Sequence, residues 1–136
     1  MGISPIHLSI TNQFKQIHLF NMEHNEHSLQ VQCVKWFKLQ YPREIIFAIP
    51  NGGFRHFSTA KRLSAEGLLA GIPDLMIPTP NSEFHGLFIE MKYGKNTTSK
   101  QQKIIIESLK AKGYKCEVVK SFEAFTLLVN TYYSQM

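Results

Sequence analysis

The stretch "LFIEMKY", residues 87–93, places an acid and a base two residues apart in an otherwise apolar run. Side chains of a strand alternate between its two faces. Glu90 and Lys92 would therefore share a face with Phe88, and the opposite face would be apolar: Leu87, Ile89 and Met91. We expect one face of this strand to belong to the core and the other to carry chemistry.

Periodicity and turn residues around this stretch predict an α/β fold, a mixed central sheet flanked by helices. Helical spacing with capping or stop residues predicts four helices, over 26–41, 58–67, 99–113 and 121–133. Apolar and β-branched runs predict four strands, over 44–49, 74–77, 87–93 and 115–119. The turn-rich residues 78–86 would join the second and third strands as a hairpin.

Length and composition indicate one globular domain. The chain has 136 residues, of which 43% are hydrophobic and 18% charged. Residues 1–25 lack sustained periodicity and are expected to form an arm or a short extra element before a domain at 26–136. No apolar run approaches the roughly 20 residues that span a bilayer, and the start lacks the features of a signal peptide. We expect a cytoplasmic protein without membrane contact.

The cysteines indicate the redox compartment of the protein, and the charges indicate the class of molecule that it binds. Cys33 and Cys116 are isolated from each other and from any Cys/His cluster, which favours a reducing compartment. The net charge is +5, and residues 92–120 hold eight lysines against two glutamates. A local basic excess favours a polyanion such as nucleic acid, although exposed lysines also serve solubility. Candidate contacts to DNA phosphates are Arg55, Lys61, Arg62, Lys95 and Lys100.

A second acid stands close to this strand in the predicted hairpin. Asp74 follows Pro73 at the start of the strand 74–77, and the hairpin could bring it near Glu90. Two carboxylates without a paired arginine repel each other, and a hard divalent cation such as Mg²⁺ relieves that repulsion. Lys92 could then orient a water or offset charge on a phosphate. The alternative is an ion pair between Glu90 and Lys92 on the same face of the strand, worth under about 1 kcal/mol, with Asp74 capping a turn.

Three short motifs together resemble those of the PD-(D/E)XK nucleases, and specifically the VRR-NUC family: "GIPD" at 71–74, "IEMK" at 89–92 and "SKQQ" at 99–102. The resemblance extends upstream through "EHSLQ" (26–30), "PNGG" (50–53) and "AEGLLAGIPDL" (65–75), and so covers residue 26 to the C-terminus. It implies a restriction-endonuclease-like core of the order αβββαβ. It also implies that Asp74, Glu90, Lys92 and Gln102 are catalytic, and that Asp74, Glu90, the Met91 carbonyl and Glu26 bind the metal.

Several of these residues also fit structural roles. Ser99 and Gln102 have capping-box spacing, and we expect Gln102 to serve either the cap or the site, not both. Asn51 with Gly52 and Gly53 most simply forms a turn with positive φ. Glu26 and Gln30 share a helix face that could meet the site or only solvent. His24 and His27 offer a rival zinc site without a third partner at motif spacing.

The resemblance implies an endodeoxyribonuclease that depends on Mg²⁺ or Mn²⁺ and is specific for branched DNA such as Holliday junctions. It further implies a homodimer, whose two-fold symmetry would match that of a four-way junction. Two other classes stay open on the residues alone. One is a nucleic-acid-binding module without chemistry, and the other is a plain interaction domain whose lysines only confer solubility.

Overall fold

The computed structural model describes residues 24–51 and 57–136. Arg55, the glycines at 52 and 53 and most of the predicted arm lie outside these residues. The helices are α2 (Glu26–Gln40), α3 (Phe57–Ala65), α4 (Lys100–Ala111) and α5 (Phe122–Ser134). The strands are β1 (Phe47–Ala48), β2 (Leu75–Ile77), β3 (Leu87–Met91) and β4 (Lys115–Val119). The predicted order of elements is confirmed.

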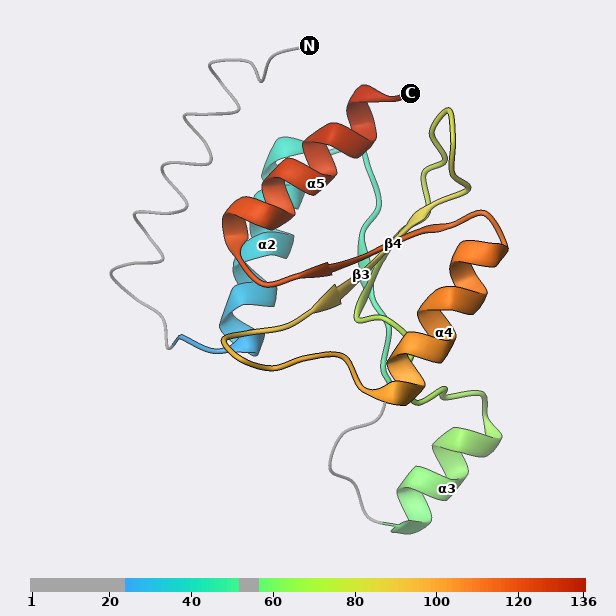
Figure 1. Cartoon of the computed structure of the whole chain (residues 1–136). Coiled ribbons are helices and arrows are strands. Elements are labelled where there is room, and N and C mark those ends of the chain that lie inside the picture. Colours follow the sequence, from blue (N-terminus) through green and yellow to red (C-terminus); the bar gives the residue numbers. More distant parts are fainter. Residues whose placement is uncertain (1–23, 52–56) are drawn as a thin grey trace.

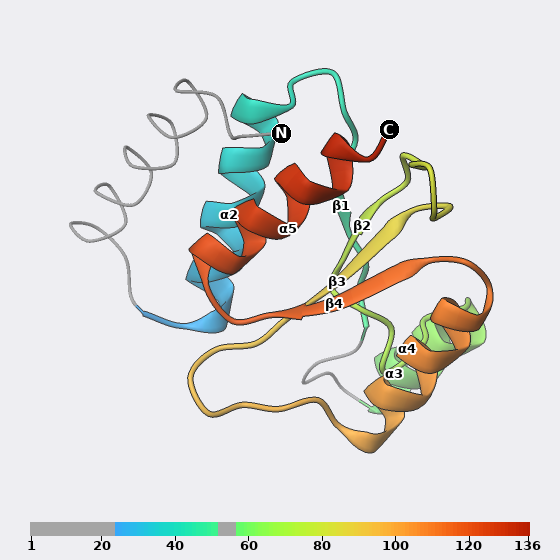
Figure 2. The same ribbon diagram turned by 45° about the horizontal axis from the view of Figure 1, so that its top comes forward.

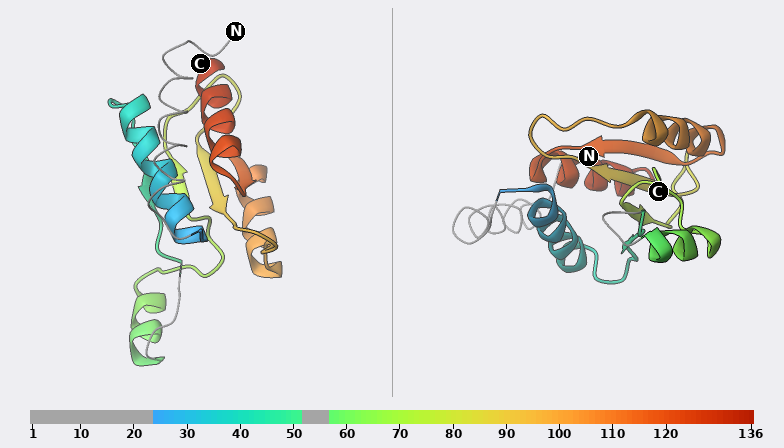
Figure 3. Two further views of the ribbon diagram at one scale, coloured as in Figure 1. Left: turned by 90° about the vertical axis from the view of Figure 1, so that its left-hand side faces the viewer. Right: turned by 90° about the horizontal axis from the view of Figure 1, so that it is seen from below.

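The four strands form one mixed sheet in the order β1-β2-β3-β4. β1 with β2 and β2 with β3 are antiparallel, which confirms the hairpin, whereas β3 and β4 are parallel. Helices α2 and α5 cover one face of the sheet and α4 covers the other (Figures 1 and 2). Helix α3 projects from the end of the molecule at which α2 and α4 begin (Figures 1 and 3).

Strand β3 lies at the centre of the packing. Its apolar face joins the main core with α2 and α5, around the fully buried Trp36 and Phe125. Phe88, on the other face, packs with Ile106 and Cys116 beneath α4. The predicted alternation of the two faces is therefore confirmed, and the second face also contributes to packing. It is apolar at Phe88 and polar where β3 ends.

Strand β1 is shorter than the sequence indicates. Residues 44–49 were expected to be extended, but only Phe47–Ala48 form the strand. β1 is an edge strand, and its partner β2 has only three residues. Ile45 is 60% exposed and Phe47 is 44% exposed, so their hydrophobicity does not reflect core packing. Pairing nevertheless continues next to the strand, because the Ile49 N–H donates to the Asp74 carbonyl at 2.8 Å.

Membrane-spanning helices were sought in the part of the chain that the structure describes. None of its helices combines the length and the apolar character that crossing a bilayer requires.

Candidate active site

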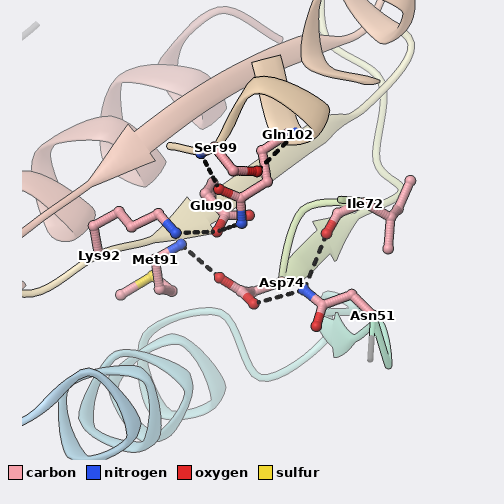
Figure 4. Close-up of polar contacts among 8 residues, drawn as sticks. All are labelled: Asn51, Ile72, Asp74, Glu90, Met91, Lys92, Ser99 and Gln102. Carbon is pink, nitrogen blue, oxygen red and sulfur yellow. Dashed lines mark hydrogen bonds and ion pairs between the residues drawn. The ribbon is translucent and has the colours of Figure 1, made fainter. Parts of the chain in front are cut away.

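The hairpin register brings the two predicted acids together. Leu75 pairs with Ile89, and one further step of the same antiparallel register places Asp74 opposite Glu90. Asp74 immediately precedes β2, and Glu90 is the penultimate residue of β3. The predicted proximity of the two acids is therefore confirmed. Both lie where the sheet ends, at the side from which α2 and α4 start (Figures 1 and 4).

Asp74 is held by two donors (Figure 4). One carboxylate oxygen, Oδ2, accepts the backbone N–H of Met91 at 2.8 Å, and Oδ1 accepts the Asn51 side-chain amide at 3.2 Å. The same Asn51 amide donates to the Ile72 carbonyl at 3.1 Å. Asn51 therefore fixes both the acid and the loop that leads to it.

Asn51 itself does not have positive φ, and the two glycines of the predicted turn lie outside the described residues. The sequence offered only a weak hint of its contact with Asp74. Asn51 follows an apolar run that predicts a strand. Its contact with Asp74 requires that this strand lie beside the strand that begins after Asp74, and the order of strands in the sheet is a property of the whole fold. Local turn statistics could not supply that order.

Glu90 is buried and only partly satisfied. Its side chain is 2% exposed. The Oε1 atom accepts the Gln102 amide at 2.9 Å and lies 3.2 Å from Lys92 Nζ, whereas Oε2 is buried and has no hydrogen-bond partner. Burial, followed by the negative charge of Asp74, raises the pKa of Glu90 to about 7, against the lowering effect of Lys92. The Oε2 atom of Glu90 is therefore a buried acceptor to which no group in the described part of the chain donates.

Lys92 forms the ion pair with Glu90 that the sequence allowed. Its side chain is 11% exposed, so the pair with Glu90 is not a solvated surface bridge. The contribution below about 1 kcal/mol expected for an exposed pair therefore does not apply to it. The Lys92 backbone is also fixed, because its N–H donates to the Val119 carbonyl of β4 at 2.9 Å.

Gln102 serves the helix cap and the site at once, so the expectation that it would serve only one is wrong. Its Oε1 accepts the Ser99 N–H at 2.8 Å, and the Ser99 hydroxyl accepts the Gln102 N–H at 3.2 Å, which completes a capping box at the start of α4. Its Nε2 is left to donate to Glu90. The two ends of one amide perform the two tasks (Figure 4).

The remaining predicted metal ligands are less closely placed. Glu26, in the first turn of α2, is half-buried; burial raises its pKa, while the charges of Lys92 and Asp74 lower and raise it respectively. It therefore faces the same group of charges. Within residues 24–51 and 57–136, no three His, Cys, Asp or Glu side chains are grouped to hold a metal. Glu26 and the Met91 carbonyl stay predicted ligands, and His24 and His27 are exposed.

The donor set fits a hard divalent cation. Mg²⁺ is usually bound by one or two carboxylates, and it completes its shell with water and substrate phosphate. Asp74 and Glu90 supply the two carboxylates, and the unpartnered Oε2 of Glu90 is an oxygen of the kind that such a cation takes. Binding of Mg²⁺ therefore does not require three protein side chains as ligands.

The candidate DNA contacts lie at the surface. Lys61 and Arg62 are exposed on α3, Lys95 is exposed between β3 and α4, and Lys100 is exposed at the first residue of α4. The ribbon places α3, the β3–α4 connection and the start of α4 around the end of the molecule that holds the two acids (Figures 1 and 3). Exposed basic groups thus lie around the end of the sheet that holds the buried Glu90 and the half-buried Asp74.

Comparisons with known proteins agree with this geometry. Residues 13–123 match the VRR-NUC domain. A solved structure described as a VRR_NUC domain protein is 26% identical in sequence, covers 85% of this chain and 93% of its own, and superposes with a TM-score of 0.69. Among curated proteins, none gives a significant sequence match. The VRR-NUC match takes in Asp74, Glu90, Lys92 and Gln102 and spans most of the chain, which therefore belongs to the VRR-NUC family, a family generally of nucleases.

Proposed function

We propose that the protein is an endodeoxyribonuclease that depends on Mg²⁺ or Mn²⁺, cuts branched DNA such as four-way junctions, and acts as a homodimer. The observation that carries the proposal is the buried, unpartnered Oε2 of Glu90 beside Asp74, with Lys92 Nζ 3.2 Å from the other Glu90 oxygen. A structural ion pair leaves no reason for that second oxygen to be buried without a donor.

Each residue has a distinct task in this proposal. Asp74 and Glu90 would hold the cation, with the Met91 carbonyl and Glu26 as further ligands. When bound, the cation supplies Lewis-acid polarisation of the phosphate and lowers the pKa of a coordinated water. Lys92 positions the attacking water and offsets negative charge that develops on the phosphate. Gln102 holds the Glu90 carboxylate in place, and Asn51 does the same for Asp74.

The preference for branched DNA rests on size and charge. A single small domain offers little surface for reading base edges, whereas its exposed basic side chains suit phosphates. Such contacts recognise the shape of the backbone. A homodimer would present two sites related by a two-fold axis, which suits two strands of a symmetric junction.

The test is a cleavage assay on labelled four-way junction, flap and linear duplex DNA, each with Mg²⁺, Mn²⁺ or EDTA. Wild type should nick the junction most rapidly, only with metal, and Glu90→Ala and Lys92→Ala should be inactive. Glu117→Ala is the matched control, because Glu117 lies on the neighbouring strand, 47% exposed and paired with Lys115 at 3.4 Å. It should cleave as wild type does.

Two outcomes would reject the proposal. Salt-sensitive DNA binding without cleavage of any substrate would indicate a nucleic-acid-binding module. No salt-sensitive binding at all would indicate an interaction domain. Sedimentation equilibrium of the protein, alone and with junction DNA, tests the homodimer separately.

A further inference from the structure

Helix α3 has an unusual relation to the rest of the protein. None of its side chains at positions 58–65 is buried. Only Thr59 and Leu63 are half-buried, and their spacing of four places them on one side of the helix. The ribbon shows α3 standing apart from the layered body (Figure 3). Packing against the core therefore explains little of why this helix is present.

The exposed side of α3 carries a defined group of residues. Ser58, Lys61, Arg62 and Ala65 follow the spacing i, i+3, i+4 and i+7, so they share one face, and all four are exposed. We call them the α3 face. On this face the cations Lys61 and Arg62 lie between two small residues, and the small side chains leave room for a partner to approach closely. The nearest acid, Glu66, lies 4.0 Å from Arg62, with both side chains more than 60% exposed, so this weak contact is easily exchanged.

The α3 face is tied to the site by a short, tightly packed connection. Asp74 follows Ala65 by nine positions, a reach of at most about 30 Å. Within that connection Gly71 has φ +89°, and a Cβ there would lie 2.9 Å from the Gln101 side chain and 3.2 Å from its backbone. The connection is thus packed against the first turn of α4. A turn of B-DNA spans about 34 Å, so one turn of duplex can reach both places.

We infer that the α3 face is a docking surface for the phosphate backbone of duplex DNA next to the bond that is cut. The inference rests on the proposed function, which supplies the reason for DNA at the site. Two adjacent cations suit a row of phosphates, and the small residues beside them let the backbone approach. The α3 face has no aromatic side chain on which a base could stack. A protein partner would have to bring acids to meet both cations.

The test measures binding without cleavage. Junction and linear duplex carrying a fluorophore are titrated by anisotropy in EDTA over a series of salt concentrations. Lys61→Ala with Arg62→Ala should lower the magnitude of the slope of log K against log salt by about 2, and weaken binding roughly 10- to 100-fold at about 0.1 M salt. Lys110→Ala with Lys112→Ala removes the same charge from the last turns of α4, where both lysines are exposed. This control pair should change neither quantity appreciably.

The outcomes separate this inference from the proposed function. An α3 double variant with an unchanged slope, while wild type still cleaves, overturns the inference and leaves the nuclease intact. Equal losses in both double variants also overturn it, because binding then follows total charge. A lower slope confined to the α3 variant supports it, even if no substrate is cut. The unfolding temperature should stay unchanged in the α3 variant, since neither side chain is packed.

Discussion

The two ends of the sheet differ in how their carboxylates are placed. At the end away from the site, the Tyr41 hydroxyl donates to Asn130 at 2.5 Å and the Tyr132 hydroxyl donates to the Thr79 carbonyl at 2.7 Å. The Thr79 hydroxyl in turn donates to Glu44 at 2.7 Å. At the site end, Glu90 keeps one buried oxygen without a donor. The half-buried Glu44 thus accepts a hydroxyl, whereas the buried Glu90 leaves one oxygen without a donor. The far end has an unpaired group too, but it is the neutral hydroxyl of Tyr133, which stacks on Tyr41.

This difference assigns stability and chemistry to separate places. The bonds at the far end join α2, α5 and the residues after β2, so they hold the helical layer on the sheet. The site end keeps two carboxylates close together, and one of them is buried with an elevated pKa. Two close carboxylates, one of them buried, lower the free energy of unfolding. Destabilising arrangements of this kind concentrate at functional sites. The following substitutions test that separation.

The largest effect is expected for Asp74→Asn. Loss of the charge should lower metal-dependent cleavage by about 10³-fold or more. Stability should also fall, by about 1–3 kcal/mol. Asn51 and the Met91 N–H donate to different oxygens of Asp74, and in the variant one of these oxygens is replaced by an NH2 group that cannot accept. Cleavage rates and urea unfolding measure the two effects. Glu107→Gln, an exposed acid on α4, is the control, and a comparable loss there would contradict the assignment.

The pH dependence of stability is the second effect. Without metal, the pKa of Glu90 is about 7 in the folded protein against an ordinary 4.5. A raised pKa means that the stability linked to protonated Glu90 is fully present below pH 4.5 and is lost as pH rises through 7. Wild type should lose up to about 3 kcal/mol relative to Glu90→Gln over that interval.

Urea unfolding of both proteins in EDTA at pH 4.5, 6 and 8 measures this difference. Mg²⁺ should then stabilise wild type more at pH 8 than at pH 4.5, because ligand binding adds stability only where the carboxylate is ionised. Parallel curves for the two proteins would show that Glu90 titrates normally.

Two asparagines at opposite ends give a matched pair. Asn51→Ala removes the donor to Asp74 and to the Ile72 carbonyl, and should slow cleavage about tenfold with little change in DNA affinity. At the far end, Asn81→Ala removes a donor to the Tyr132 carbonyl at 3.2 Å and an oxygen that accepts two backbone N–H groups of the following turn. It should cost about 1 kcal/mol of stability and leave the cleavage rate unchanged. Equal effects of both on cleavage would remove the distinction between the ends.

The smallest effect is expected for Ser99→Ala. It removes one half of the capping box of α4 and should cost about 1 kcal/mol of stability. Cleavage should change by no more than about twofold, since the Gln102 amide still donates to Glu90. A tenfold slower reaction would mean that the cap, rather than the amide, holds the carboxylate.

The sequence predicted those parts that depend on local pattern. The alternation in residues 87–93 gave the two faces of β3, and Ser99 with Gln102 gave the capping box. The motifs placed Asp74 and Glu90 in one site, and the register explains how. The length of β1 could not be predicted, because Ile45 and Phe47 are apolar yet exposed at an edge. The Asn51–Asp74 bond and the second role of Gln102 depend on which segments meet in three dimensions, which spacing alone does not set.

The order of the elements also has a consequence for synthesis of the chain. Asp74, Glu90, Lys92 and Gln102 lie between residues 74 and 102, and the first two meet through a hairpin whose partners are close in sequence. Such local pairing forms fast. The apolar face of β3 is covered in part by Phe125 and Val129 of α5, which follows all four of these residues in the chain and therefore leaves the ribosome after them. We therefore expect the acids to be paired early, but to become a fixed site only when α5 has been released and has docked.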